Sequence, residues 1–373
     1  MGDKIQQDSA ELLRLREKID SCDKQILRLV QERVLIAGKI AKAKMAVDQD
    51  ASFYRPEREA QVLRRVRERN VGLREELGGL VSDDDMVRLM REIMSISLAA
   101  EMPLTVAYLG PEGTYTQAAV LKHFGNAVKC VDVKTISDVF RIVEQRKAQF
   151  GVVPVENSTE GVITHTLDCF SSSDLKVCGE VQLPINHQLL SHADGLSSIK
   201  EVYAHPQALA QCRDWLERYL PDADLVAASS NAEAAVIASK GESVAAVAGE
   251  MAAKLYDLPV LASSIEDERN NTTRFLIIGN DSYAESGEDK TTIMVSAPNK
   301  VGSLFDLLKP LYDAGVDMSR IESRPSKQTN WEYVFFIDLT GHVNDPKVSA
   351  ALQELESKSA FFKLIGSYPV GAL

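Results

Sequence analysis

The sequence has no excess of positive charge, no long apolar run and no paired-cysteine motif. Lysine and arginine number 42 against 54 aspartates and glutamates, which gives a net charge of −12 at pH 7 and a pI of about 5.1. Because the chain is acidic, neither nucleic acid nor an anionic membrane is expected as a partner. No stretch approaches the ~20 apolar residues of a membrane span, and no signal-peptide region is visible.

The five cysteines form no CxxC pair and are odd in number. This usage predicts reduced thiols and a cytoplasmic protein. The six histidines fall in no metal-ligand spacing, so no metal site is expected. A chain of 373 residues is too long for one ordinary core and predicts two or three domains.

The first hundred residues predict a helical domain. From Ser9 to Ala46 there is no proline, and two series of positions repeat every seven residues, offset by three. The series are Leu12, Ile19, Ile26, Arg33 and Ile40, and Leu15, Cys22, Leu29, Ile36 and Ala43. This heptad pattern predicts one long helix that needs a partner. Pro56 suits the first turn of a second helix, and Ser82 the cap of a third.

The remaining sequence predicts two further domains. Short apolar strands alternate with helical stretches from about Met102 to Gly279, which indicates an α/β domain or two α/β lobes with a cleft. After a polar linker, a strand–helix–strand–strand–helix–strand order predicts a ferredoxin-like plait, with the third strand expected to begin at Trp331. The predicted domains are an all-α domain over residues 1–102, a two-lobed α/β domain over 103–282 and the plait over 288–373.

Arg33 interrupts the apolar seam of the first helix. Such a residue sets register, snorkels to solvent or serves a site. Lys44 lies three turns later on nearly the same face, whereas Arg16 lies roughly 42 Å from Lys44 along a helix that rises 1.5 Å per residue. If Arg16 and Lys44 share a site, Arg16 must come from a second, antiparallel chain. The pattern therefore predicts an intertwined homodimer or a higher homo-oligomer.

These cations and their neighbours resemble the all-helical AroQ-type chorismate mutases. The resemblance rests on Leu15-Arg16-Glu17-Lys18-Ile19-Asp20, Glu32-Arg33, Lys42-Ala43-Lys44, Arg58-Glu59, Ser97 and Glu101. It implies a domain that rearranges chorismate to prephenate. Such a domain holds a dicarboxylate in a compact chair and stabilises negative charge on the ether oxygen.

The resemblance assigns roles to the charged residues. Arg16 of the partner chain and Arg33 would bind carboxylates, and Lys44 would donate to the ether oxygen. Arg58 and Glu59 would orient the substrate, Glu59 through its hydroxyl. Arg58 and Glu59 are also compatible with ordinary charges on a helix surface.

Ser97 and Glu101 are one turn apart on the third helix and would close the site. The best-known member of the family has glutamine where Glu101 stands. A glutamate donates to the ether oxygen only when it is protonated, so we expect a raised pKa for Glu101 or a mildly acidic optimum. Arg55 occupies the region of the sequence where that member has an aspartate, and its role is left open.

Four motifs mark the α/β segment. They are Gly110-Pro111-Glu112-Gly113-Thr114-Tyr115-Thr116, Pro154-Val155-Glu156-Asn157-Ser158-Thr159-Glu160-Gly161, His205-Pro206-Gln207-Ala208 and Thr272-Thr273-Arg274-Phe275. Each one alone is also typical of an ordinary turn, helix start or strand. Together they resemble prephenate dehydratase over residues 104–279. The implied reaction converts prephenate to phenylpyruvate with loss of carbon dioxide and the ring hydroxyl, and it requires no metal and no redox cofactor.

The opening of the last strand carries the predicted chemistry. Thr273 would hydrogen-bond or relay a proton to the leaving hydroxyl, Arg274 would hold a carboxylate, and Phe275 would anchor the strand or wall the pocket. Polar contacts across the cleft are expected from Asn157, Ser158 and Gln207. Glu156 is the alternative acid, if burial raises its pKa.

Two segments of the plait resemble the ACT regulatory domain. They are Gly302-Ser303-Leu304-Phe305, where the family usually has GALV, and Glu322-Ser323-Arg324-Pro325. A glycine helix start and a strand-end turn would account for them equally well. The resemblance implies that L-phenylalanine binds at a contact between two such domains and inhibits the enzyme.

The three resemblances follow one another along the chain and imply a bifunctional enzyme of phenylalanine biosynthesis. A mutase fused to prephenate dehydrogenase would need a GxGxxG nucleotide motif, which the sequence lacks. A non-catalytic amino-acid-sensing module with a vestigial mutase segment is the alternative from another class. The mutase-like cations argue against it.

Overall fold

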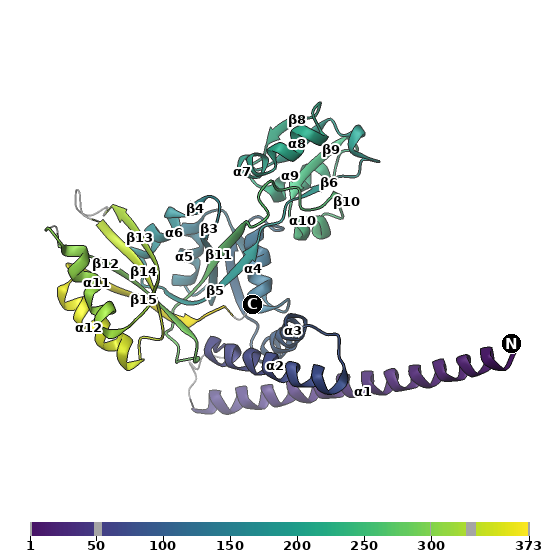
Figure 1. Ribbon diagram of the computed structural model, residues 1–373, viewed down its shortest axis with the longest axis horizontal. Coiled ribbons are helices and arrows are strands. Elements are labelled where there is room, and N and C mark those ends of the chain that lie inside the picture. Colours follow the sequence, from purple (N-terminus) through teal and green to yellow (C-terminus); the bar gives the residue numbers. More distant parts are fainter. Residues whose placement is uncertain (1, 48–53, 299, 326–332, 372–373) are drawn as a thin grey trace.

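The computed structural model describes residues 2–47, 54–298, 300–325 and 333–371, with side chains described from residue 11 onward. The described chain forms a helical part, a two-lobed α/β part and a C-terminal sheet with two helices (Figure 1). This is the multidomain fold predicted from the sequence. None of the helices in these ranges combines the length and hydropathy needed to cross a lipid bilayer.

The helical part consists of α1 (Gly2–Val47), α2 (Pro56–Leu77) and α3 (Asp83–Glu101). Pro56 opens α2 as predicted, and the Ser82 side chain caps α3 by accepting a hydrogen bond from the Asp85 amide at 3.1 Å. The C-terminal half of α1 packs along α3, and its N-terminal half projects beyond the rest of the chain (Figure 1).

The heptad seam of α1 is exposed in the single chain. Ile19, Ile26 and Leu29 expose 60%, 57% and 63% of their surface. Burying apolar side chains of this size stabilises a protein by roughly 1.5–3 kcal/mol each. The seam therefore has the character expected of an α1 that pairs with a second helix.

The first α/β lobe is a mixed sheet flanked by helices. Its strands, in spatial order, are β2 (Lys129–Val133), β1 (Thr105–Leu109), β3 (Phe150–Asn157), β11 (Thr272–Gly279) and β5 (Lys176–Pro184), with β4 (Gly161–Val162) paired to β3. Its helices are α4 (Tyr115–Phe124), α5 (Ile136–Glu144) and α6 (Thr164–Phe170). Strand β11 returns to this sheet from the second lobe and pairs antiparallel with both β3 and β5.

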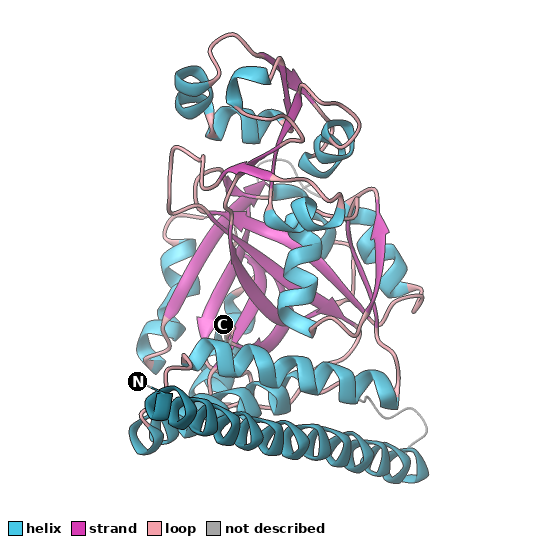
Figure 2. Ribbon diagram, turned by 90° about the vertical axis from the view of Figure 1, so that its right-hand side faces the viewer, coloured by secondary structure: helices cyan, strands magenta, loops and turns pink. Residues whose placement is uncertain are grey.

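The second lobe is a smaller sheet above the first (Figure 2). Its strands, in spatial order, are β10 (Val260–Ala262), β6 (Gln188–Leu190), β9 (Val244–Ala248), β7 (Glu201–Ala204) and β8 (Asp224–Ala227). Its helices are α7 (Pro206–Gln211), α8 (Arg213–Tyr219), α9 (Asn231–Ala238) and α10 (Glu250–Leu255). The chain crosses between the lobes twice, from β5 to β6 and from β10 to β11.

The C-terminal part has the predicted order β12 (Asp289–Ser296), α11 (Ser303–Ala314), β13 (Met318–Pro325), β14 (Tyr333–Thr340), α12 (Pro346–Lys358) and β15 (Phe361–Pro369). The strands form an antiparallel sheet in the order β13-β14-β12-β15, which is a ferredoxin-like plait. Trp331, where we predicted the third strand to begin, lies outside the described residues. Helices α11 and α12 lie on the outer side of this sheet, and the other face meets the first lobe (Figure 1).

Candidate active sites

Four of the predicted mutase residues meet between α1 and α3. Arg33 donates from Nη1 to the Ser97 hydroxyl, and also to the Ile93 carbonyl at 3.3 Å. Ser97 in turn donates to the same carbonyl at 2.7 Å. Glu101, one turn beyond Ser97, lies in the electrostatic field of both Arg33 and Lys44. We call Arg33, Lys44, Ser97 and Glu101 the helical cluster.

The two ionisable groups of this cluster that respond to burial do so in opposite directions. Partial burial raises the pKa of the Glu101 carboxyl, although Lys44 and Arg33 oppose the shift. Burial lowers the pKa of the Arg33 guanidinium, and Glu101 opposes that change. The raised pKa of Glu101 has the direction that its predicted role as a proton-bearing donor requires.

The remaining predicted mutase residues lie elsewhere in the single chain. Arg16 is exposed on the projecting half of α1, and Arg58 is exposed on α2. The Glu59 carboxylate lies 3.5 Å from Arg91 Nε, in a small cavity between α2 and the first lobe, and burial raises the pKa of Glu59 to about 7 despite Arg91. Arg55 pairs with Glu57 at 3.2 Å. The structure therefore does not bring Glu59 to the helical cluster.

A second candidate site lies between the two α/β lobes. A cavity of about 360 Å³ opens there, and Thr273, Asn157, Gln207 and Phe275 are among the residues that line it. We call it the interlobe cavity. It lies where the chain crosses from one lobe to the other, a position at which clefts commonly bind small molecules.

The Thr273 hydroxyl is oriented by Asn157. The Asn157 side-chain oxygen, Oδ1, accepts from the backbone amides of Thr159 and Glu160, both at 3.0 Å, so the side-chain nitrogen, Nδ2, must face the other way. That nitrogen donates to Thr273 Oγ1 at 2.8 Å. The described part of the chain offers the Thr273 proton no acceptor, which leaves this proton available to a ligand in the cavity.

A chain of hydrogen bonds extends this pair across the cavity wall. Asn157 donates to the Asn271 side chain at 2.7 Å, Asn271 donates to Gln211 Oε1 at 3.4 Å, and the same oxygen lies 2.8 Å from His187 Nε2. Burial lowers the pKa of His187, so its ring is neutral at neutral pH. Sequence reasoning missed Asn271, Gln211 and His187. Only Gln211 had a local signal, because it lies one turn after Gln207.

The cavity offers a lysine and two helix starts to an anion. Lys134 is the one lysine or arginine among the described residues that line it. The residues that open α4, Thr114 and Tyr115, and those that open α9, Ser230 and Asn231, also line it. Backbone amides at helix starts favour negatively charged groups. A small carboxylate is therefore the kind of ligand that this wall suits.

Three predicted dehydratase residues are not in this cavity. Arg274 follows Thr273 on a strand and faces the other side of the sheet, where it donates to Glu180 at 2.7 Å and to Asp338 at 2.6 Å. Glu156 forms an ion pair with Arg320 at 2.9 Å. Ser158 donates to the Asn270 carbonyl at 3.0 Å. The geometry thus gives no support to Arg274 as a substrate ligand or to Glu156 as the acid.

The first predicted effector segment opens α11. Gly302 caps this helix with φ of 81°, in the left-handed region that favours glycine. Ser303 is buried and donates to the backbone carbonyls of Pro298 and Lys300. Leu304 and Phe305 are exposed, Phe305 by 71%.

The second predicted effector segment, Glu322-Ser323-Arg324-Pro325, ends β13, the edge strand of the C-terminal sheet. Arg324 pairs with Asp168 of α6 at 2.9 Å, and Ser323 and Pro325 are exposed. An edge strand with exposed apolar neighbours such as Ile321 is a surface that a second copy of this sheet could extend.

Within the described residues, no three His, Cys, Asp or Glu side chains gather in a way that could hold a metal ion. The helical cluster and the interlobe cavity instead present hydroxyl, amide and cationic groups. Such groups suit reactions that depend on charge stabilisation and proton donation.

Three family models match consecutive parts of this chain. They are chorismate mutase type II over residues 15–102, prephenate dehydratase over residues 106–283 and the ACT domain over residues 291–357. The first match contains the helical cluster, the second contains the interlobe cavity, and the third contains both predicted effector segments.

Curated relatives match nearly the full length of the chain. A bifunctional chorismate mutase/prephenate dehydratase of Pseudomonas aeruginosa is 48% identical over 370 residues, covering 98% of this chain and 100% of the relative. A protein of the same description from Neisseria gonorrhoeae is 48% identical and covers 96% of this chain and 97% of the relative.

Among solved structures, a prephenate dehydratase from Arthrobacter aurescens in complex with L-Phe is similar to this chain. It is 35% identical with a TM-score of 0.66, covering 71% of this chain and 90% of that chain.

Proposed function

Because this chain belongs to the family of bifunctional chorismate mutase/prephenate dehydratases, we propose that it converts chorismate to prephenate and prephenate to phenylpyruvate. The helical cluster would carry out the first reaction and the interlobe cavity the second. We place the mutase domain at residues 1–102, the dehydratase domain at 103–282 and the ACT domain at 288–373. A cytoplasmic location is in keeping with the five cysteines, which form no disulfide within the described residues.

The observation that carries this proposal is the coincidence of full-length family membership with two separate polar sites. Purified protein given chorismate at neutral pH, with no added cofactor, should form prephenate and then phenylpyruvate. A nucleotide requirement, or binding of an aromatic amino acid without any turnover, would contradict the proposal.

The mutase reaction moves no group between protein and substrate, so the helical cluster acts by positioning and charge stabilisation. Arg33 would break its hydrogen bond to Ser97 and bind a substrate carboxylate. Its guanidinium group can donate to both carboxylate oxygens at once. Lys44 and protonated Glu101 would donate to the ether oxygen as its C–O bond breaks. Arg58 and Glu59 are proposed to orient the substrate only in an arrangement of α2 that brings them to the cluster.

The pKa of Glu101 gives this mechanism a pH dependence. A carboxyl with a raised pKa keeps its proton to higher pH, so mutase kcat/KM should fall as pH rises through a value above the ordinary 4.5, by about tenfold per unit. Glu101→Gln carries a donor at every pH and should flatten the profile. The pH–rate profile of mutase activity measures both. Identical profiles for the two proteins would contradict a proton-bearing role.

The dehydratase reaction breaks two bonds and forms an aromatic ring. The bond to the ring carboxylate breaks with release of carbon dioxide, its electron pair enters the ring, and the C–O bond to the ring hydroxyl breaks. The departing hydroxide takes up a proton and leaves as water. Thr273, held by Asn157, would donate its hydroxyl hydrogen bond to that group.

Binding of prephenate would use the remaining cavity wall. Lys134 and the amides that open α4 and α9 would hold its carboxylates, while Gln207, Gln211 and Asn271 would contact its polar atoms. Phe275 is buried by 98% and would form the apolar floor. Arg274, Glu156 and Ser158 would support the strands from outside the cavity.

We propose that the chain works as a homodimer in which α1 helices pair antiparallel and Arg16 of the partner chain completes the mutase site. The exposed heptad seam of α1 supports this arrangement. Arg16→Ala and Lys44→Ala should each lose mutase activity, and a refolded mixture should regain about a quarter of the wild-type sites, because half of the dimers are mixed and each has one intact site. No regain on mixing would place Arg16 outside a shared site.

We further propose that L-phenylalanine inhibits the dehydratase by binding to the ACT domain, at Gly302–Phe305 and Glu322–Pro325. The exposed Phe305 and the edge strand β13 would form the contact between two such domains. Added L-phenylalanine should weaken the apparent affinity for prephenate by about 5- to 150-fold, the usual range of allosteric coupling. Dehydratase assays across a phenylalanine series measure this effect, and a flat response would remove the regulatory role.

A further inference from the structure

Strands β3 and β11 each carry two adjacent residues that face opposite ways, one toward the interlobe cavity and the other toward the C-terminal domain. In their antiparallel register Thr273 lies opposite Asn157, and Arg274 lies opposite Glu156. Side chains alternate between the two faces of a sheet, so each pair has its own face. Thr273 and Asn157 line the cavity, whereas Arg274 and Glu156 contact the C-terminal sheet.

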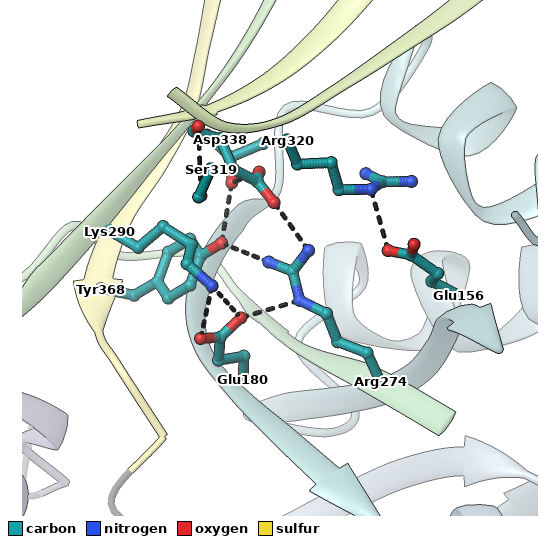
Figure 3. A network of polar contacts seen from close by, with 9 residues as sticks. Glu156, Glu180, Arg274, Lys290, Ser319, Arg320, Asp338 and Tyr368 are labelled. Atoms are coloured by element: carbon teal, nitrogen blue, oxygen red, sulfur yellow. Dashed lines mark hydrogen bonds and ion pairs between the residues drawn. The ribbon is translucent and has the colours of Figure 1, made fainter. Parts of the chain in front are cut away.

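The Arg274 guanidinium donates hydrogen bonds from all three of its nitrogens to side chains that are buried (Figure 3). Nε donates to Glu180 at 2.7 Å, Nη1 donates to Asp338 at 2.6 Å, and Nη2 donates to the Tyr368 hydroxyl at 3.0 Å. Glu180 also accepts from Lys290 at 2.7 Å. We call these five residues the ion cluster.

The ion cluster joins five strands of two domains. Arg274 and Glu180 belong to β11 and β5 of the dehydratase domain, and Lys290, Asp338 and Tyr368 belong to β12, β14 and β15 of the ACT domain. The Glu180 and Asp338 side chains are each only 3% exposed. Two buried carboxylates face two cations, so the loss of any one partner leaves a charge uncompensated.

A second ion pair between the two domains starts from β3, the strand that pairs with β11. Glu156, adjacent to Asn157 on β3, pairs with Arg320 at 2.9 Å (Figure 3). Arg320 lies on β13, two residues before Glu322 of the proposed effector segment. The strand that would contact phenylalanine therefore also contacts the strand that orients the Thr273 hydroxyl.

The backbones of the two domains meet beside these bridges. A Cβ atom at Gly366 of β15 would lie 2.2 Å from the Val177 carbonyl oxygen of β5, so the two strands touch without an intervening side chain. Met294, Phe336 and Ile365 of the ACT sheet continue the apolar core of the first lobe. Close-packed contacts of this kind transmit displacements.

We propose that the ion cluster and the Glu156–Arg320 pair position Thr273 and Asn157. The ACT domain then contributes to the geometry of the dehydratase site, and an effector bound to the ACT domain acts on that site through these contacts. This inference rests on the proposed function of the interlobe cavity. Arg274 is then a positioning residue that acts through the backbone of Thr273, not a ligand of the substrate.

The plain alternative is a clamp that only holds the domains together. A clamp affects the amount of folded protein, whereas a positioning device affects turnover of the folded protein and its response to the effector. Misplacing a catalytic group by about 1 Å from a remote site lowers turnover by up to 10²-fold. Turnover measured per folded molecule therefore separates the two roles.

The test compares Asp338→Asn and Tyr368→Phe with the control Lys363→Gln. Lys363 also bridges the two domains, donating to the Phe170 carbonyl at 3.1 Å and pairing with Asp174 at 3.7 Å, and neither of these partners belongs to β3 or β11. Tyr368→Phe removes a single hydroxyl and keeps the ring, so it serves if Asp338→Asn does not fold. Mutase activity of each protein reports on folding, and calorimetry with L-phenylalanine reports on effector binding.

Asp338→Asn should lower dehydratase kcat by at least about tenfold with KM and mutase activity unchanged, and Tyr368→Phe should lower it less. Both variants should still bind L-phenylalanine but show a weaker inhibition by it. Lys363→Gln should keep kcat and inhibition. The inference is overturned if the cluster variants behave like Lys363→Gln in both kcat and inhibition. Failure of the proposed function would give a different result, because Thr273→Ala would then keep full dehydratase activity.

Discussion

Replacing Thr273 with alanine should lower dehydratase kcat by about 10²- to 10³-fold, the usual cost of removing one donor to a developing negative charge. The variant loses the hydroxyl whose proton faces the interlobe cavity, while Asn157 keeps its other partners. Mutase activity should not change, because the helical cluster lies in another domain. Steady-state assays with prephenate and with chorismate measure the two activities separately.

Two variants serve as controls for this prediction. Thr273→Ser keeps the hydroxyl and should retain most of the activity, and Thr272→Ala alters the neighbouring threonine, which does not line the cavity. A dehydratase rate that survives Thr273→Ala would show that Thr273 is not the donor. A similar loss in Thr272→Ala would show that the strand, rather than the hydroxyl, is at fault.

Replacing Lys44 with alanine should lower mutase kcat/KM by about 10²- to 10³-fold and leave the dehydratase unchanged. Lys44 is half-buried beside Glu101, and we assign it the donor role at the ether oxygen. The assay follows loss of chorismate at neutral pH. Lys42→Ala removes an exposed lysine two residues away and should have no effect on either activity.

The outcome for Lys44 bears on where the first reaction takes place. If Lys44→Ala keeps full mutase activity, the helical cluster is not the mutase site. If Lys42→Ala and Lys44→Ala lose activity equally, the general charge of α1 and not a specific donor is responsible.

The local signals in the sequence predicted the elements well. Pro56 begins α2, and Ser82 caps α3. Both could be predicted because a helix start depends only on residues within the first turn of the helix. The strand and helix order after residue 289 predicted the plait, since alternation with period 2 or 3.6 is a local property. The heptad pattern predicted the single long α1.

Contacts between distant residues were less accessible. Asn157 and Thr273 are 116 residues apart, and their meeting depends on β11 returning to the first sheet. Asn271 and His187 lie in the two crossing segments, where no periodic pattern marks a side chain. The motif resemblance pointed to Thr273 as a candidate site residue. The hydrogen bonds that surround it could be seen only in the three-dimensional structure.

Arg274 illustrates a different limit. Alternation along β11 already implies that Thr273 and Arg274 face opposite sides. The sequence could not say that the ACT sheet covers the second side, and so the motif suggested a shared ligand. The position of Glu59 could not be predicted for the same reason. The face that α2 turns toward the first lobe depends on a contact with Arg91 from another helix.

The central claim is that one chain holds two separate active sites, the helical cluster and the interlobe cavity. The most direct test mixes purified Thr273→Ala and Lys44→Ala proteins and supplies chorismate at neutral pH. Thr273→Ala alone should accumulate prephenate and Lys44→Ala alone should leave chorismate unconverted, whereas the mixture should form phenylpyruvate. Loss of both activities in either variant alone, with no phenylpyruvate from the mixture, would contradict the claim.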